Sequence, residues 1–453
     1  MSTGVKPDVS AGVQPTFRRA VFLMTVTSFL VPAAGVITAP ILARALSTDG
    51  RGEMAAALAP AALTLAAATL GLPDALTFYL AKHPGMTRRA LAWASVVTVV
   101  LGGLCVLITA IALPFLSAGD PGLGHLILLA AAITVPALVI GVFRGAAIGR
   151  QMWWTVSIER LINTSLRIIV YLVLWLSGTL DVFTAVLVSV LTPLVSGVVY
   201  VRLLARPPQE DGEPPPDGGS LRPIVSFGTK VWFGSVASML LSRSSQLLMA
   251  PLSSVQDLGL YTVASTISDL PLIVALAIQG ALFGVNSKTT DAGQVTSTTR
   301  LTVLAGLIGC TVLGLTLPFW IGPLFGPEFA GATVPTLLLL ASALLCIPGL
   351  MAATGISAWG RPGLRSAGLG ITLVANVAVF VFLVPPLGVL GACLTSLASN
   401  VVMTTFMVVV ASRIMQVPAS DFLVIRRADV LRGWHEGNRL RRRVVAFLPA
   451  RGT

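Results

Sequence analysis

Four basic side chains stand inside long apolar stretches of the sequence, where a charge needs a physical reason. They are Arg144, Arg167, Lys230 and Arg243. A charge at the centre of a membrane-spanning helix costs roughly 2.5–3.5 kcal/mol on insertion scales, so such residues usually face a cavity or a partner. Guanidinium groups remain charged and present forked donors that match phosphate oxygens. We therefore expect these residues to line a cationic cavity for a phosphate-bearing ligand.

Each of these cations also has a plainer interpretation. Arg144 and Lys230 could lie near the cytoplasmic ends of their helices and extend their charged heads to water. Arg243 lies over a dozen residues beyond Lys230 in the same stretch, too deep for this to be the simpler account. Arg167 falls between the two cases. The cavity hypothesis is therefore strongest for Arg243.

Two carboxylates, Asp74 and Asp269, also fall inside apolar stretches. Asp74 follows Pro73, which frees a backbone carbonyl and makes a local polar site. Asp74 could instead pair with Arg44 or lie at the outer interface. Asp269 could pair with Arg243 across neighbouring helices. Both acids are candidate proton-coupling groups.

The elements that position these charges are membrane helices. Of the 453 residues, 55% are hydrophobic and 11% are charged, with a mean hydropathy of +0.89, far from the balance of a soluble domain. Apolar runs of the roughly 20 residues that cross a bilayer recur from end to end. The strands of an outer-membrane barrel would be shorter and would alternate. The sequence therefore predicts an all-α polytopic membrane protein.

Charges, Pro/Gly turns and polar clusters divide the chain into twelve predicted transmembrane helices. The first six lie at 20–43, 54–81, 90–117, 126–148, 153–178 and 182–203. The second six lie at 225–250, 258–286, 301–323, 330–357, 364–384 and 389–412.

The order of segments predicts two six-helix bundles with short flanking parts. Residues 206–221 are rich in Pro and acidic residues and form a linker between bundles at 20–205 and 222–412. Residues 1–19 form an N-terminal segment and residues 413–453 a basic tail. The tail's apolar residues recur at helical spacing between 421 and 448, which favours an amphipathic helix on anionic membrane lipids over a disordered basic tail.

Lys and Arg gather on one side of the predicted spans, and the turns on the other side hold chiefly acids. Because cytoplasmic loops retain basic residues, we expect both termini and the linker to be cytoplasmic in a multi-pass protein of the cell (plasma or inner) membrane. The formal charge of +12 mainly reflects this topology, so the sequence predicts no nucleic-acid partner.

The two halves also echo one another. Residues 43–52 can be laid beside residues 250–259, which places Gly52 opposite Gly259. Asn163 and Asn376 likewise follow matching Gly-Arg turns. Weak internal repeats are typical of transporters with a site between the repeats, although chance similarity of apolar sequence is the alternative.

Several segments of the second half occur in the order of a known family. They are Leu258–Ala264, Leu324–Phe329, Gly360–Pro362, Asn376 and Val384–Ala392. Together they resemble the polysaccharide transporter, or oligosaccharide flippase, family of the multidrug, oligosaccharidyl-lipid and polysaccharide (MOP) flippase superfamily. The resemblance adds Gln246 to the expected substrate-binding residues. Ser245 stands where many members carry an acid, which argues against coupling by a carboxylate at that point.

This resemblance implies two bundles around a central cavity and alternating access between the two membrane faces. The expected substrate is a polyprenyl-pyrophosphate-linked oligosaccharide, moved from the inner to the outer leaflet for cell-surface polysaccharide biosynthesis, with glycan-assembly enzymes as further partners. A multidrug or organic-cation exporter of the same superfamily is the alternative. Cationic drugs call for acidic cavities and a lipid pyrophosphate for basic ones, and the basic excess favours the flippase.

Catalysis is not expected. His83, His125 and His435 are scattered, so they form no metal site, and the sequence holds no phosphate-binding glycine loop or nucleophile elbow. The sequence therefore predicts neither an enzyme nor a cofactor. A scaffold without transport would leave the charges within the membrane without a purpose.

Overall fold

The computed structural model describes residues 15–83, 85, 87–201 and 222–424 of the chain. Within these ranges every regular element is helical, which confirms the predicted all-α class. Eight of the described helices are long and apolar enough to cross a membrane. The linker at 206–221, residues 1–14 and the tail beyond residue 424 lie outside the described ranges, so predictions for them remain predictions.

The first half follows the predicted order of spans closely. Its elements are α1 (Pro15–Ala67), α2 (Leu72–Lys82), α3 (Thr87–Ile111), α4 (Leu113–Leu116), α5 (Pro121–Gly149), α6 (Trp153–Leu176), α7 (Val182–Gly197) and η2 (Val198–Tyr200). Two predicted turns end in acidic N-caps. Asp120 accepts a hydrogen bond from the Gly122 N–H (2.7 Å) at the start of α5, and Asp181 forms a capping box with Thr184 at the start of α7.

The second half has the same character. Its elements are α9 (Arg222–Leu252), α10 (Val255–Thr289), α11 (Ala292–Phe325), η4 (Pro327–Ala332), α12 (Thr333–Ala358), α13 (Pro362–Met415) and α14 (Ser420–Leu423). The last two predicted spans both lie within α13, which breaks at Gly388 (φ 55°), inside the predicted Pro-Pro-Leu-Gly turn. Only glycine adopts this backbone conformation without strain.

The first predicted turn is shorter than expected. Residues 44–53 were expected to form a loop, yet α1 is helical on both sides of a single kink at Ser47 (φ 59°, ψ −173°). The second predicted span is divided instead. It breaks between Ala67 and Leu72, just before Pro73. Proline has no backbone N–H, so it cannot donate a hydrogen bond to the preceding turn of the helix.

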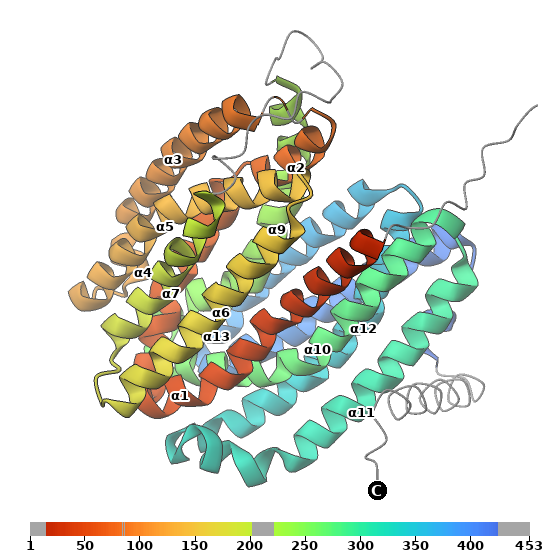
Figure 1. Cartoon of the computed structure of the whole chain (residues 1–453). Coiled ribbons are helices and arrows are strands. Elements are labelled where there is room, and N and C mark those ends of the chain that lie inside the picture. Colours follow the sequence, from red (N-terminus) through yellow and green to blue (C-terminus); the bar gives the residue numbers. More distant parts are fainter. Residues whose placement is uncertain (1–14, 84, 86, 202–221, 425–453) are drawn as a thin grey trace, which may run out of the picture.

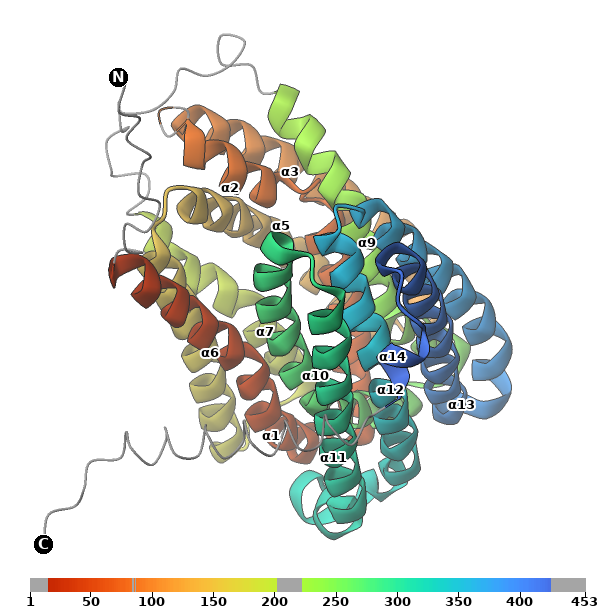
Figure 2. The same cartoon turned by 90° about the vertical axis from the view of Figure 1, so that its right-hand side faces the viewer.

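Two groups of helices face one another across the molecule. In Figures 1 and 2 the first-half helices α3 and α5 lie on one side and the second-half helices α11 and α12 on the other. The helix α1 packs against α10, and α9 reaches across from α13 to α1 and α2. The chain therefore forms two helical halves joined by α1 and α9.

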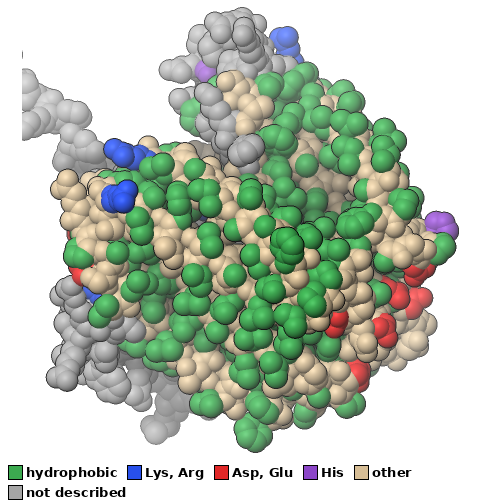
Figure 3. Space-filling model, turned by 180° about the vertical axis from the view of Figure 1, so that it is seen from behind, with side chains coloured by type: hydrophobic (Ala, Val, Ile, Leu, Met, Phe, Trp, Pro, Cys, Tyr) green, Lys and Arg blue, Asp and Glu red, His purple; other side chains and the backbone are tan. Residues whose placement is uncertain are grey.

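The acidic turns mark one end of the molecule, called here the acidic end, defined by Asp49, Asp120, Asp181 and Asp257. Figure 3 shows the acidic side chains gathered at one end, with Lys and Arg toward the other. The opposite, basic end is defined by the turns that hold Arg88, Arg89, Arg150 and Arg361. This is the separation of charge that the sequence predicted.

The hydrophobic core is shared at one end only. Near the acidic end a single buried cluster includes Leu42, Met54 and Tyr171 of the first half with Leu258 and Phe380 of the second. Near the basic end each half has a core of its own. One is built around Leu80 and Val156 in the first half, and the other around Ile356 and Met415 in the second. The two halves therefore share a core at the acidic end and have separate cores toward the basic end, where α9 still bridges them through its contact with α2.

The joint at the acidic end is a reciprocal contact between two glycines. A methyl group placed on Gly52 would lie 1.8 Å from the carbonyl oxygen of Val255. A methyl group on Gly259 would lie 1.9 Å from the carbonyl oxygen of Thr48. Thr48 and Val255 occupy equivalent positions in the two echoing segments, as do the glycines. The sequence echo therefore corresponds to a contact in which the two segments exchange roles.

Candidate functional site

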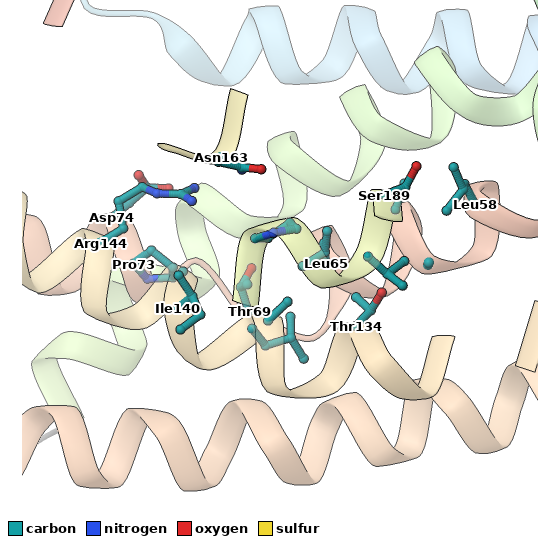
Figure 4. Close-up of a pocket in the computed structure, with 18 of the residues that line it drawn as sticks. Leu58, Leu65, Thr69, Pro73, Asp74, Thr134, Ile140, Arg144, Asn163 and Ser189 are labelled. Atoms are coloured by element: carbon teal, nitrogen blue, oxygen red, sulfur yellow. The ribbon is translucent and has the colours of Figure 1, made fainter. Parts of the chain in front are cut away.

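The first half encloses a cavity of about 610 Å³ between α1, α2, α5, α6 and α7. Its polar lining includes Asp74, Arg144, Asn163, Arg167 and Ser189 together with three threonines, Thr69, Thr77 and Thr134. Figure 4 shows Asp74, Arg144 and Asn163 toward one end of this cavity, and Leu58, Thr134 and Ser189 toward the other. Two of the predicted cations, Arg144 and Arg167, thus share one interior space.

Arg144 is held by a buried carboxylate. Its Nη2 and Nε donate to the two carboxylate oxygens of Glu159, at 2.9 and 3.2 Å. Glu159 has no exposed surface and also accepts hydrogen bonds from the hydroxyls of Ser196 (3.4 Å) and Tyr200 (3.3 Å). The side chain of Arg144 remains 35% exposed. Its charge is therefore compensated inside the protein while one face of the guanidinium stays open to the cavity.

Sequence reasoning missed Glu159, although the spacing held a signal. Arg144 lies six residues before the turn at 150–152 and Glu159 seven residues after it, on helices that run antiparallel. Two such residues lie level with each other across a helical hairpin. A buried pair of opposite charges was therefore readable from the turn position and the two residue types.

Arg167 and Asn163 lie one helical turn apart on α6 and both line the cavity. Both carry a buried polar atom without a hydrogen-bond partner: the Nε of Arg167 and the Oδ1 of Asn163. Buried polar atoms are nearly always paired in proteins, and an unpaired one costs about 1–3 kcal/mol. The cavity thus offers one free donor and one free acceptor side by side.

Asp74 lines the same cavity, just after the break between α1 and α2. The pairing with Arg44 considered from the sequence is wrong, because Arg44 donates to the carbonyls of Pro323 and Leu324 at the end of α11. The broken helix is instead bound by Trp232 of α9, whose indole N–H donates to the carbonyl of Ala67 (2.8 Å). The helix break predicted to make a polar site therefore ties α9 to the first half.

The second half has its own cavity of about 480 Å³ between α9, α10, α12 and α13. Arg243 and Gln246 line it, with Arg243 Nη1 donating to Gln246 Oε1 (2.5 Å). Asp269 of α10 lines the same cavity, but no ion pair joins it to Arg243 in the described part of the chain, so the suggested pairing is not observed. Arg365, which sequence reasoning did not single out, lies on the wall as well.

The amides of this second cavity are engaged. Asn376 accepts a hydrogen bond from the Ser244 hydroxyl (2.8 Å) and donates to the Ser399 hydroxyl (2.9 Å). Asn400 donates to the hydroxyl of Ser342 (2.9 Å). The wall therefore carries hydroxyl and amide groups that are already bonded to one another.

The predicted cations are thus divided. Arg144 and Arg167 line the first cavity and Arg243 the second, and no described residue lines both. Lys230 lies on α9, but its side chain is outside the described part of the chain. No group of three or more His, Cys, Asp or Glu side chains suited to a metal occurs among the described residues.

Solved structures of transporters share this architecture. A multidrug resistance MATE family transporter of the MOP superfamily, in an inward-facing conformation, is 15% identical with a TM-score of 0.64, over 88% of this chain and 99% of the other. The lipid II flippase MurJ, in an inward closed conformation, is 10% identical with a TM-score of 0.71, over 91% and 92%. The fold is therefore that of MOP-superfamily transporters and flippases, and these neighbours are not enzymes.

A family model places the chain more directly. No curated protein matches the chain. The model described as "Polysaccharide biosynthesis protein" matches residues 17–290, more than half of the chain, including the first cavity and the helices α9 and α10. With its helices of membrane-spanning length, this chain is a multi-pass membrane protein that belongs to the polysaccharide biosynthesis protein family.

Proposed function

We propose that this protein flips a polyprenyl-pyrophosphate-linked oligosaccharide from the inner to the outer leaflet of the cell membrane. The proposed mechanism is alternating access of the two helical halves. Such a headgroup is charged and rich in hydroxyls, so it cannot give up its hydrogen bonds to water while crossing hydrocarbon. An interior polar path can replace those hydrogen bonds while the polyprenyl tail remains in lipid.

The observation that carries this proposal is the charge of the two cavities. Four arginines line them, Arg144, Arg167, Arg243 and Arg365, against the acids Asp74 and Asp269 and the buried Glu159 that pairs with Arg144. Arginine presents forked donors to phosphate oxygens. The phosphate groups of a glycan lipid match this basic lining, and the polysaccharide biosynthesis family supports a glycan as the headgroup.

The side from which the substrate enters is inferred from the arrangement of the hydrophobic core. The halves share a hydrophobic core at the acidic end and have separate cores at the basic end, so a substrate would enter from the basic end. Basic loops remain in the cytoplasm, which makes this the cytoplasmic side, with both termini there. Enzymes that assemble the glycan would supply the substrate on that side, and membrane lipids surround the exposed apolar helix faces.

The test is translocation of a fluorescent short-chain polyprenyl-pyrophosphate oligosaccharide in liposomes that contain the purified protein. The Arg167→Ala/Arg243→Ala double variant removes one cation from each cavity and should reduce translocation at least about tenfold, the scale of a lost charge-assisted hydrogen bond. The control is Arg89→Ala/Arg361→Ala, which removes two exposed arginines outside both cavities. This control should transport at the wild-type rate.

Export of organic cations is the second candidate, because Asp74 and Asp269 line the cavities. It would be favoured if the wild-type protein left the glycan lipid in place and moved an organic cation instead. Neutralising Asp74 or Asp269 tests their candidate role in proton coupling. Loss of the pH dependence of transport would support that role, and an unchanged pH profile would remove it.

A further inference from the structure

We infer, on the basis of the proposed function, that Asn163 recognises the sugar bonded directly to the pyrophosphate, while Arg167 binds the adjacent phosphate. The inference concerns the first cavity only. It starts from the two unpaired atoms on α6, the Nε of Arg167 and the Oδ1 of Asn163. One is a donor and the other an acceptor, so they call for a ligand that offers both functions.

A phosphate alone does not satisfy both atoms. An ionised phosphate has acceptor oxygens for Arg167 but no hydrogen for Asn163. A sugar hydroxyl or amide N–H next to that phosphate supplies the missing donor. Residues four apart on a helix have Cβ atoms about 5–6 Å apart, comparable with the separation of a phosphate and a hydroxyl on its own sugar. A sugar phosphate therefore matches the pair in both polarity and spacing.

The surroundings leave these atoms available to a ligand. The carboxylate of Glu159 is occupied by Arg144, Ser196 and Tyr200. The hydroxyl of Ser189, toward the other end of the cavity from Asn163, is bonded to Tyr171 (2.6 Å). Glu159 and Ser189 thus have partners of their own, and Asp74 places an acid at the same end of the cavity as Asn163.

The corresponding asparagine of the second half provides an internal control. Asn376 also lines a cavity, yet both ends of its amide are bonded, to Ser244 and Ser399. Asn376 therefore holds helices together, whereas Asn163 lines the first cavity with its buried Oδ1 unpaired. Two residues that the sequence places in the same setting should differ in what their replacement does to ligand selection.

The experiment compares two lipids on the same protein in nanodiscs. One is a short-chain polyprenyl pyrophosphate, and the other is the same lipid with a single N-acetylglucosamine. For Asn163→Leu, which keeps the side-chain size and removes the acceptor, affinity for the sugar-bearing lipid should fall about tenfold, while affinity for the bare lipid stays within about twofold. Arg167→Gln should weaken both lipids, and Asn376→Ala should leave the ratio of the two affinities unchanged.

The ratio of the affinities for the two lipids does not depend on the fraction of folded protein, because a partly unfolded sample loses binding of both lipids equally. If Asn163→Leu does not fold, Asn163→Ala removes the acceptor and should give the same ratio. An unchanged ratio in the Asn163 variant overturns the inference and leaves the flippase proposal standing. A wild-type protein that binds neither lipid overturns the flippase proposal itself.

Discussion

The two cavities are built on similar helices but treat their polar groups differently. In the first cavity Arg167 and Asn163 keep buried atoms without partners. In the second, Arg243 is bonded to Gln246, and Asn376 is bonded at both ends. Unpaired buried groups reduce stability, and a ligand bonded to Asn163 and Arg167 would remove that cost. We propose that the first cavity presents unpaired groups to a ligand, whereas several polar groups of the second are already bonded within the protein.

The largest effect is expected from breaking the ion pair between Arg144 and Glu159 at the first cavity. Replacing Glu159 by Ala leaves Arg144 without its anion and should lower the free energy of unfolding by roughly 2–3 kcal/mol, less than for a fully buried pair because Arg144 can turn toward the cavity. Thermal unfolding in detergent, followed by tryptophan fluorescence, measures this loss.

The control for Glu159 removes both partners. An Arg144→Leu/Glu159→Leu double variant leaves no unpaired charge and should be more stable than Glu159→Ala alone. A double variant that is no more stable would show that Glu159 acts through its bonds to Ser196 and Tyr200 rather than through the ion pair.

A smaller effect is expected in the second cavity. Arg243→Ala removes the cation that shares the second cavity with Asp269 and leaves Gln246 without its donor, and should cost roughly 1–2 kcal/mol of stability. Adding Asp269→Asn removes the uncompensated charge and should restore part of that loss. The four proteins of this double-mutant cycle, measured by thermal unfolding, give the coupling between the two residues. Strictly additive losses would contradict a functional pairing of Arg243 with Asp269.

The smallest effect compares one hydroxyl in each half. Ser399→Ala leaves the amide N–H of Asn376 without its partner and should cost about 1 kcal/mol. Ser189→Ala should cost about half as much, because its partner Tyr171 keeps a hydrogen bond to the carbonyl of Ala185. Equal shifts in unfolding temperature would mean that the two halves are held in the same way.

The sequence predicted the helical architecture well because membrane helices leave strong signals. Long apolar runs, acidic turns and the Pro-Pro-Leu-Gly break all correspond to observed helices or breaks. The turn near residue 47 was predicted too long, because its polar residues continue the helix on each side of Ser47. Polarity marks the end of a span more reliably than the end of a helix.

The residue types of the candidate site were predicted from the sequence, but the division of these residues between two cavities was not. Arg144, Arg167 and Arg243 do line interior cavities, yet in two separate sets. Which cations meet depends on how the halves pack, and composition carries no such information. Whether a cation is free depends on its neighbours. Arg144 is neutralised by Glu159, a residue whose role only the antiparallel pairing of α5 and α6 makes visible.

The reciprocal contact of Gly52 and Gly259 has a consequence for the speed of any switch between the two faces. The contact joins bare backbone to backbone, so no side-chain rotamer can lengthen or shorten it by degrees. Because each segment both presents a glycine and receives one, the two contacts must break together. We expect the two halves to separate at the acidic end in one step, with few partly open states between the closed and the separated forms.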